Sequence, residues 1–293
     1  MKASQSSATS GIGGIAVGIL LLVLLASFIY TPYDPNQMNI PQRLKPPSAE
    51  HWFGTDEFGR DLFSRILAGA RVSLLVGLIS ASIAAAGGIV IGATAGYFGG
   101  WLDEVSMRLM DAFMAFPGIV MALLIISIRG PGLTNTALAL GIMGIPSFAR
   151  IVRGGFLQSR EAEYVHAAIS IGASDWRIIF RHILPNQLTP IIVASSINFA
   201  AAILGEAGLS YLGLGIQPPD PSWGRMLQEG QGYIYSAPWY AIAPGLIITF
   251  TVFAFYLFSN DLQIWLQPAN LYRRREKTQA EDLPLTRSVP NSG

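Results

Sequence analysis

Residue types that carry out covalent, metal or phosphate chemistry are scarce in this chain. The 293 residues include no Cys, so the sequence holds neither a disulfide nor a thiolate metal site. The His residues form no H-E-x-x-H pair, and no G-x-S-x-G turn is present. Lys occurs only at Lys2, Lys45 and Lys277, and none follows a Gly, which excludes the G-x-x-x-x-G-K-[ST] loop that holds ATP phosphates. We therefore expect no catalytic residue, no metal site and no cofactor in this chain.

The most informative pattern lies at residues 160–185. Apolar residues recur near helical intervals from Glu161 to Ile171, and Gly172-Ala173 interrupts them. Ser174 can cap a second helix, which Leu184-Pro185 would end before the next apolar run. The segment is therefore predicted to form two short helices around a turn.

Small side chains leave one face of this segment with little bulk. They are Ala167, Ala168, Gly172 and Ala173. Such a face suits insertion into a groove on another protein. The alternative is an amphipathic helix pair that lies on the membrane surface, and the spacing alone leaves both interpretations open.

The composition indicates that this segment belongs to a membrane protein. Hydrophobic residues make up 51% of the chain and charged residues only 13%, against about 25% in ordinary soluble domains. A soluble globule would need more charge to cover its surface, and the apolar excess excludes a disordered chain. The formal net charge of +1 gives no reason to expect a nucleic-acid partner.

Apolar runs long enough to cross a bilayer core of about 30 Å recur along the chain. They predict an all-α integral membrane protein with six transmembrane helices, in which residues 160–185 join the fourth span to the fifth. The first run lacks a good cleavage site and is interpreted as an uncleaved span. Phe116-Pro117-Gly118 interrupts the third. The predicted spans are Ile12–Ile29, Val72–Tyr97, Leu109–Ile128, Thr134–Ile151, Leu188–Leu204 and Tyr240–Phe258.

Glycines at every fourth position of the second span predict close helix packing. Gly88, Gly92 and Gly96 fall on one helical face. In lipid no hydrophobic effect draws helices together, so helices pack where small residues let their backbones approach. We expect these glycines to form a tight seam, either within one chain or between two.

Two stretches are expected to stay outside the membrane. Residues 31–71 open with closely spaced Pro residues, which is typical of an extended loop. Thr55-Asp56-Glu57 then resembles a helix N-terminus, and the i,i+4 spacing of Asp56 and Arg60 predicts a short surface helix with a solvated face. Residues 206–238 contain too many prolines to span.

Basic residues indicate the cytoplasmic side. Arg residues cluster after the fourth span and again at Arg273-Arg274-Arg275, and the positive-inside rule places both clusters, and both termini, in the cytoplasm. The arginines of residues 31–71 oppose this assignment. The predicted organisation is an N-terminal tail and first span at 1–30, an extracytoplasmic loop at 31–71, a five-helix core at 72–268 and a basic, then disordered, tail at 269–293.

Three motifs resemble bacterial ABC importer permeases. His166-Ala167-Ala168-x-x-x-Gly172, followed by Ile183-Leu184-Pro185, resembles the Glu-Ala-Ala…Gly…Ile-x-Leu-Pro loop of that family. Two further stretches resemble the dipeptide/oligopeptide/nickel group, in its second-permease type. One runs from Phe53 to Arg65. The other combines residues 209–215 with Pro221-Ser222-Trp223-Gly224.

The resemblance covers about Arg43 to Pro268, with two departures. His166 stands where the family loop has its Glu, and His182 stands at the Ile position two residues before the Leu of Leu-Pro. Glu163 precedes His166 by less than one helical turn and could replace the missing Glu on the same face.

The resemblance implies a transport subunit without an ATPase site of its own. It would be a multi-pass permease of the bacterial inner membrane, forming half of a pathway for di- or oligopeptides, with residues 160–185 docked into a separate subunit that uses ATP and magnesium. The implied partners are a second homologous permease, two ATP-binding subunits, an extracytoplasmic substrate-binding protein and the lipid bilayer. The implied docking residues are Glu163, His166, Ala167, Ala168, Gly172, Ala173, Ser174, Asp175, Leu184 and Pro185.

Other functions stay open at this point. A permease of the same group could import nickel or another metal chelate, and a secondary transporter or channel would work without any ATPase. Glu206, at the end of the fifth span, is a candidate for the translocation path, because charged residues within a membrane usually face a pore or a partner. The plainer interpretation places Glu206 near the outer interface.

Overall fold

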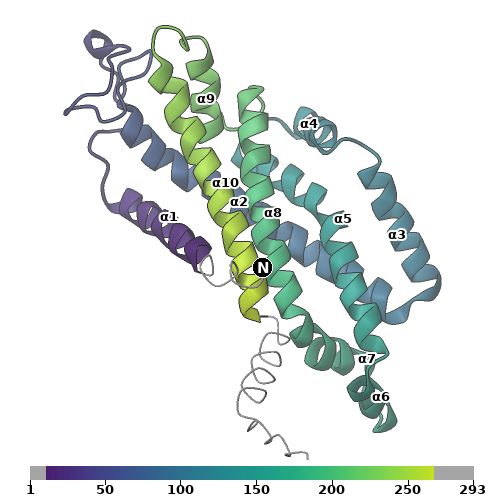
Figure 1. Ribbon diagram of the computed structural model, residues 1–293. Coiled ribbons are helices and arrows are strands. Elements are labelled where there is room, and N and C mark those ends of the chain that lie inside the picture. Colours follow the sequence, from purple (N-terminus) through teal and green to yellow (C-terminus); the bar gives the residue numbers. More distant parts are fainter. Residues whose placement is uncertain (1–10, 267–293) are drawn as a thin grey trace, which may run out of the picture.

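The computed structural model describes residues 11–266, and within that range the chain is helical without a β-strand (Figure 1). Three short non-α turns are η1 (Ile40–Gln42), η2 (Ile178–Ile183) and η3 (Leu184–Gln187). The α-helices are α1 (Ile12–Ile29), α2 (Leu62–Phe98), α3 (Gly100–Met114), α4 (Gly118–Arg129), α5 (Leu133–Arg160), α6 (Glu163–Ser170), α7 (Asp175–Arg177), α8 (Leu188–Tyr211), α9 (Trp223–Gln231) and α10 (Pro238–Leu266).

Five of these helical stretches are long and apolar enough to cross a membrane. The third predicted span, Leu109–Ile128, corresponds to α3 and α4, which are bent by 87° at the break between them. Pro117 precedes α4 with an extended backbone and has no N–H for a continuous helix, so the predicted interruption at this Pro coincides with the bend. The all-helical membrane fold is thus confirmed, with six spans when the bent pair counts as one.

The helices extend further than the apolar runs that predicted them. α2 begins at Leu62, not at Val72, where the Asp61 carboxylate accepts a hydrogen bond from the Ser64 N–H at 2.8 Å. α5 continues past Ile151 to Arg160. Apolar runs mark only the part of a helix that contacts lipid, whereas polar turns continue beyond it.

The three glycines of the second span lie against α5 of the same chain. A Cβ atom at Gly88 would lie 2.9 Å from the Ala149 nitrogen, and one at Gly96 would lie 2.8 Å from the Arg153 carbonyl oxygen. A Cβ atom at Gly92 would lie 2.8 Å from the Val152 Cβ. The seam is therefore within one chain, and it brings the backbones of α2 and α5 into contact along their shared length.

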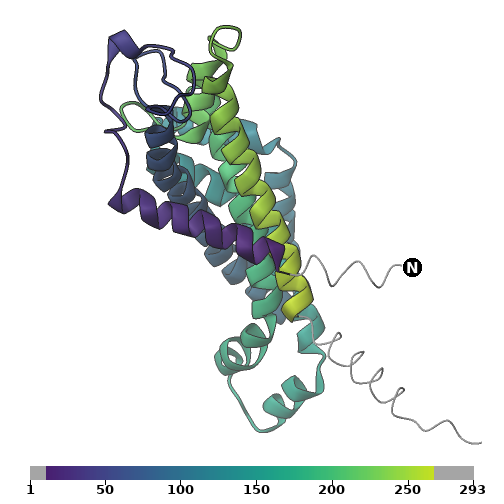
Figure 2. The same cartoon turned by 60° about the vertical axis from the view of Figure 1, so that its left-hand side comes forward.

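α1 contacts the bundle chiefly through α10. The Asp261 carboxylate accepts hydrogen bonds from the Gly11 and Gly13 N–H groups at 3.1 and 2.9 Å. A negative charge at this position stabilises the positive end of the α1 dipole. From this contact α1 runs obliquely across the bundle, as Figure 2 shows.

The bundle has two differently built ends (Figures 1 and 2). We call residues 161–187, with α6 and α7, the loop end. At the opposite end, residues 31–61 and 212–237, including α9, form a layer that we call the cap. The predicted tail at 269–293, and residues 1–10 of the predicted N-terminal segment, lie outside the described residues.

The seam between α2 and α5 generates a first prediction. Gly88→Ala should lower the unfolding temperature of the detergent-solubilised protein, because its Cβ would collide with Phe148 and the α5 backbone, and overpacking costs about 1–3 kcal/mol. Gly87→Ala is the matched control, since its Cβ meets only atoms of the Ile145 side chain, the nearest being the terminal Cδ1 at 2.8 Å, and no backbone. Equal unfolding temperatures for both variants would contradict the seam.

Candidate functional site

The loop end is packed against α2 and α5. On α6, Val165 and Ala168 point inward, and on η2, Ile178, Ile179 and Ile183 do the same, so that all five are buried. They share one apolar cluster with residues of α2 and α5, including Tyr97, Phe148, Val152 and Phe156. The loop end is therefore an extension of the bundle core.

Polar contacts tie the loop end to the same two helices. The Tyr97 hydroxyl, near the end of α2, donates a hydrogen bond to the Asp175 carboxylate at 2.7 Å. The Gln187 amide donates to the Ser159 hydroxyl on α5 at 2.8 Å. These bonds fix the start of α7 and the end of η3.

The sequence predicts that the second helix of the loop end stops at Leu184-Pro185. In the structure it continues past this point. α7, the wide π-helical turn η2 and the tight turn η3 follow one another directly into α8, so residues 175–211 form one continuous helical stretch. Pro185 lies in the first turn of η3, where its missing N–H interrupts little. The Asn186 side chain donates to the His182 carbonyl at 2.9 Å, which satisfies one acceptor at the change of helix type.

Most of the predicted docking residues are exposed, with clear exceptions. Ala168 is buried in the core cluster, so it cannot contact a partner as expected, and Ala173 and Leu184 are half-buried against that cluster. The small residues thus serve partly to bring α6 onto the bundle. Ser174 precedes α7 as predicted, but its side chain makes no capping hydrogen bond. The predicted docking residues that are exposed are Glu163, His166, Ala167, Gly172, Ser174, Asp175 and Pro185.

The tip of the loop end carries exposed apolar side chains that the sequence analysis did not select. Ile171 is 85% exposed and Trp176 is 68% exposed. The rings of Trp176 and Phe180 stack at 5.5 Å between centroids. Their i,i+4 spacing was a usable signal, because it places both aromatic side chains on the helical face opposite the buried isoleucines. Gly172 directly follows Ile171 at φ +76°, with no atom within 4 Å of a built Cβ.

Glu206 is fully buried within the protein, near the end of α8 where the cap begins. Its carboxylate accepts hydrogen bonds from the Ser73 hydroxyl of α2 at 3.1 Å and from the Ser210 hydroxyl at 2.6 Å. Ser210 in turn accepts from the Ile216 N–H at 3.1 Å, which holds the first turn of the cap. These contacts favour a structural role for Glu206, and its role in a translocation path stays a prediction.

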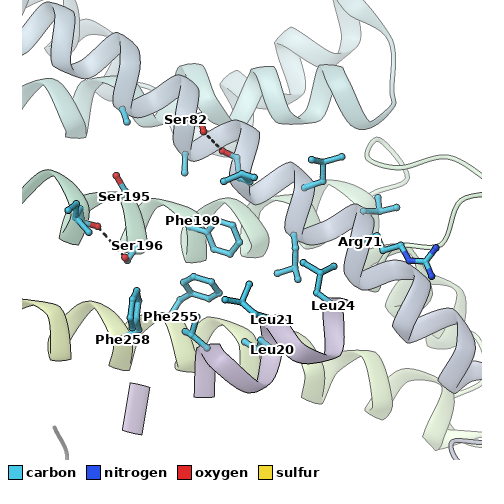
Figure 3. A pocket seen from close by; sticks show the side chains of 18 of the residues that line it. Leu20, Leu21, Leu24, Arg71, Ser82, Ser195, Ser196, Phe199, Phe255 and Phe258 are labelled. Carbon is cyan, nitrogen blue, oxygen red and sulfur yellow. Dashed lines mark hydrogen bonds between the residues drawn. The ribbon is translucent and has the colours of Figure 1, made fainter. Parts of the chain in front are cut away.

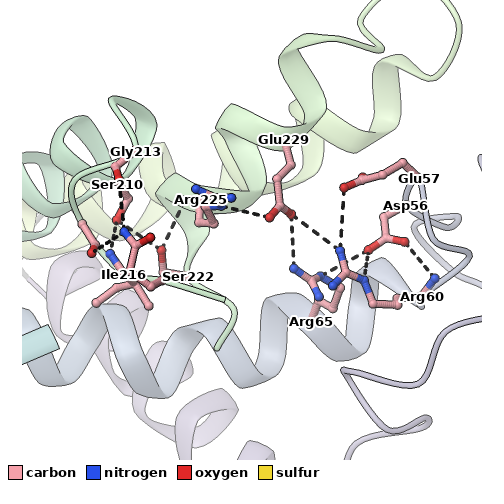
Figure 4. A network of polar contacts seen from close by, with 12 residues as sticks. Asp56, Glu57, Arg60, Arg65, Ser210, Gly213, Ile216, Ser222, Arg225 and Glu229 are labelled. Carbon is pink, nitrogen blue, oxygen red and sulfur yellow. Dashed lines mark hydrogen bonds and ion pairs between the residues drawn. The ribbon is translucent and has the colours of Figure 1, made fainter. Parts of the chain in front are cut away.

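A buried ionic cluster joins the cap to α2 (Figure 4). Asp56 is fully buried and pairs with Arg60 and, at 3.5 Å, with Arg65. Glu229 of α9 lies 3.3 Å from Arg65 and 3.0 Å from Arg225. Burial of the nearby Glu57 carboxyl raises its pKa above the usual value. The cluster is an ion-pair network that unites segments far apart in sequence.

This cluster corrects the prediction of a solvated surface helix at Asp56 and Arg60. The segment is a tight turn in which the Asp56 carboxylate accepts from the Phe58 and Arg60 N–H groups at 2.8 and 2.9 Å. Gly59 adopts φ +73°, and a Cβ there would collide with Asn39, so only Gly fits. The i,i+4 spacing was a turn signal here, not a helical one.

The second motif of the cap docks α9 on the membrane helices. The Ser222 side chain caps α9 by accepting from the Arg225 N–H at 3.2 Å. Trp223 is buried and its indole N–H donates to the Ile66 carbonyl of α2 at 3.0 Å. A Cβ at Gly224 would lie 2.6 Å from the Ala207 carbonyl oxygen, so α9 contacts the α8 backbone directly.

Residues 88–270 match the family described as binding-protein-dependent transport system inner membrane component. The chain belongs to this family. It is thus a permease component of such a transport system and a multi-pass protein of the inner membrane, and membership implies ATPase and other partners in general.

Curated relatives match along most of the permease. The dipeptide transport system permease protein of Alkalihalophilus pseudofirmus is 43% identical over 88% of this chain and 84% of its own. The glutathione transport system permease protein of Pectobacterium atrosepticum is 42% identical over 87% and 86%. The probable D,D-dipeptide transport system permease protein of Escherichia coli K12 is 41% identical over 92% and 89%.

Solved structures share the fold. An inward-facing MetNI methionine ABC transporter chain aligns with a TM-score of 0.57 at 16% identity, covering 68% of this permease and 95% of that chain. A chain of an amino acid ABC transporter aligns with a TM-score of 0.52 at 20% identity, covering 72% and 94%. The helix arrangement is therefore that of ABC transporter permeases.

The hydrogen bond from Tyr97 of α2 to Asp175 of α7 leads to a second prediction. Tyr97→Phe should speed tryptic cleavage after Arg177 about fivefold, because the loss of one hydrogen bond costs about 1 kcal/mol at a partly exposed site. Tyr164→Phe, at an exposed position of α6, is the control and should leave cleavage unchanged. A cleavage rate that Tyr97→Phe does not raise would contradict the tethering role of the Asp175 bond.

The ionic cluster generates a third prediction. Glu229→Gln should lower the free energy of unfolding by about 3–5 kcal/mol, because it leaves Arg65 and its neighbours buried without their shared carboxylate. Glu104→Gln is the control, since Glu104 pairs with Arg108 on an exposed face and should cost at most about 1 kcal/mol. Chemical denaturation in detergent measures the free energy of unfolding of both variants. Equal losses in the two variants would contradict a stabilising role of the cluster.

Proposed function

We propose that this permease forms half of the translocation pathway of an ATP-driven importer for peptides. Support for the substrate class comes from the relatives, which are named for dipeptide, D,D-dipeptide and glutathione transport. All three are short peptides or peptide-like molecules.

In this proposal the loop end receives the mechanical work of a separate ATP-binding subunit. A coupling element must be stiff enough to transmit force and must expose a surface that a partner can hold. The single observation that carries the proposal is that the loop end meets both needs. Its inner side is sealed into the bundle core, whereas its tip exposes Ile171, Trp176 and Phe180 beside the open turn at Gly172. Single exposed apolar residues are ordinary, but a contiguous group indicates a contact site.

The proposed assembly contains four kinds of subunit. A second, homologous permease would complete the pathway, and two ATP-binding subunits, carrying ATP and magnesium, would hold the loop ends. A substrate-binding protein would deliver its cargo to the cap. The arginines at 177 and 181 support a cytoplasmic loop end by the positive-inside rule, and both termini would then be cytoplasmic.

Gly172→Trp tests this proposal. In cells that express the complete transporter, the variant should insert into the membrane but lose ATP-dependent uptake of a radiolabelled dipeptide, because the indole would stand in the docking surface. The ATP-binding subunit should also no longer co-purify with it.

The matched control is Gly172→Asn. Asn tolerates a positive φ, so this variant separates added bulk from backbone strain and should retain most uptake. Normal dipeptide uptake by Gly172→Trp would contradict the docking role. Loss of uptake while the ATP-binding subunit still co-purifies would also contradict it, because the turn would then be needed for a step other than docking.

A further inference from the structure

A long apolar groove lies between α1, α2, α8 and α10 (Figure 3). Its volume is about 750 Å³. α1 lines it from Val17 to Phe28, a length of about 16 Å at 1.5 Å per residue. From the other side Phe199 of α8 and Phe255 of α10 point into it. The groove exists because α1 is held to α10 at its start and reaches α2 only near its end, at Ser27 and Phe28.

The polar side chains along this groove are already satisfied. The hydroxyls of Ser82, Ser195 and Ser196 donate to backbone carbonyls of their own helices, at 2.7, 2.9 and 3.2 Å. None of them needs a hydrogen-bond partner from an occupant. An occupant of the groove must therefore be apolar along its length.

One charged side chain closes the groove at its cap-side end. The Arg71 Nε donates to the Ser27 hydroxyl at 3.1 Å, and the guanidinium lies 4.8 Å from the centre of the Phe28 ring. Among the described residues no carboxylate lies within ion-pair distance of Arg71. Arg71 lies beside the last turn of α1 and directly precedes the apolar run that begins at Val72, so the cation stands at the polar edge of that apolar run.

We propose that the groove binds the acyl chain of an anionic phospholipid whose phosphate pairs with Arg71. Arg71 has no carboxylate partner among the described residues, and a phosphate is the anion that the membrane supplies at its polar edge. The phosphate of an anionic phospholipid is not already paired with a cationic group of the same lipid, as that of phosphatidylcholine is. Besides its Nε–H, the guanidinium offers the N–H donors of both terminal nitrogens, in the fork geometry that suits phosphate. The lipid would also fill the wedge that separates α1 from α2.

A helix of another subunit suits this groove less well. It would need an apolar face along the whole groove and would also have to bring a carboxylate to Arg71. A phospholipid supplies the apolar chain and the anion in one molecule.

The test uses the complete transporter in phosphatidylcholine vesicles. They carry a small fraction of phosphatidylglycerol with a photoreactive diazirine on one acyl chain. Illumination should label peptides that contain Leu21, Leu24 and Phe255, identified by mass spectrometry. Arg71→Gln should lower this labelling about fivefold, as expected for one phosphate contact, whereas Arg71→Lys should retain most of it.

Arg129→Gln is the matched control. Arg129 lies at the end of α4, away from the groove, so its loss removes the same charge without touching the site. A phosphatidylcholine probe that labels wild-type protein as strongly as the phosphatidylglycerol probe would overturn the proposal, and this comparison needs no variant. Labelling that Arg71→Gln does not reduce would also overturn the proposal. So would cross-linking to another subunit when Leu24 is replaced by benzoylphenylalanine, because that result would show a protein in the groove.

Discussion

The close approach of α2 to α5 is the contact on which the remaining structure depends. In lipid, helices gain nothing from hiding apolar surface from water, so their pairing rests on van der Waals contact between backbones that small residues permit. Gly88, Gly92 and Gly96 supply that contact over two turns of α2. The last of them precedes Tyr97, whose ring belongs to the core under the loop end and whose hydroxyl binds Asp175. The seam thus determines where the loop end lies.

The cap is held to the bundle largely by ion pairs rather than by van der Waals packing of helices. Apart from α9, which packs on α8, its segments are short and mostly non-helical, so they cannot rely on helix packing. The buried pairing of Asp56 and Glu229 with Arg60 and Arg65 joins them to α2 instead. Two of the arginines in residues 31–71, Arg60 and Arg65, serve this pairing and so have a structural role in the cap.

Much of the architecture could be predicted from local pattern alone. Apolar length identified the spans, the Pro in Phe116-Pro117-Gly118 identified the bend, and glycine spacing identified a packed face. Local pattern failed where the deciding partner is distant in sequence. Nothing near Asp56 and Arg60 reveals Glu229, so a buried cluster looked like a solvated helix face. Ala168 looked like part of a docking face because the cluster that buries it comes from other helices.

The continuity of the loop end with α8 has a mechanical consequence. Residues 175–211 form 37 residues of uninterrupted helical chain, about 55 Å at 1.5 Å per residue and longer than the apolar core of a bilayer. One end bears the exposed Trp176, and the other holds Glu206 and Ser210, which bind α2 and the first turn of the cap. A displacement of the loop end must therefore either tilt α8 as one body or change the helical turns at residues 178–187. Those turns depart from α-helical geometry, as is common where helices adjust under strain. A single helix can thus connect events at the two faces of the membrane without any chain of side-chain rearrangements between them.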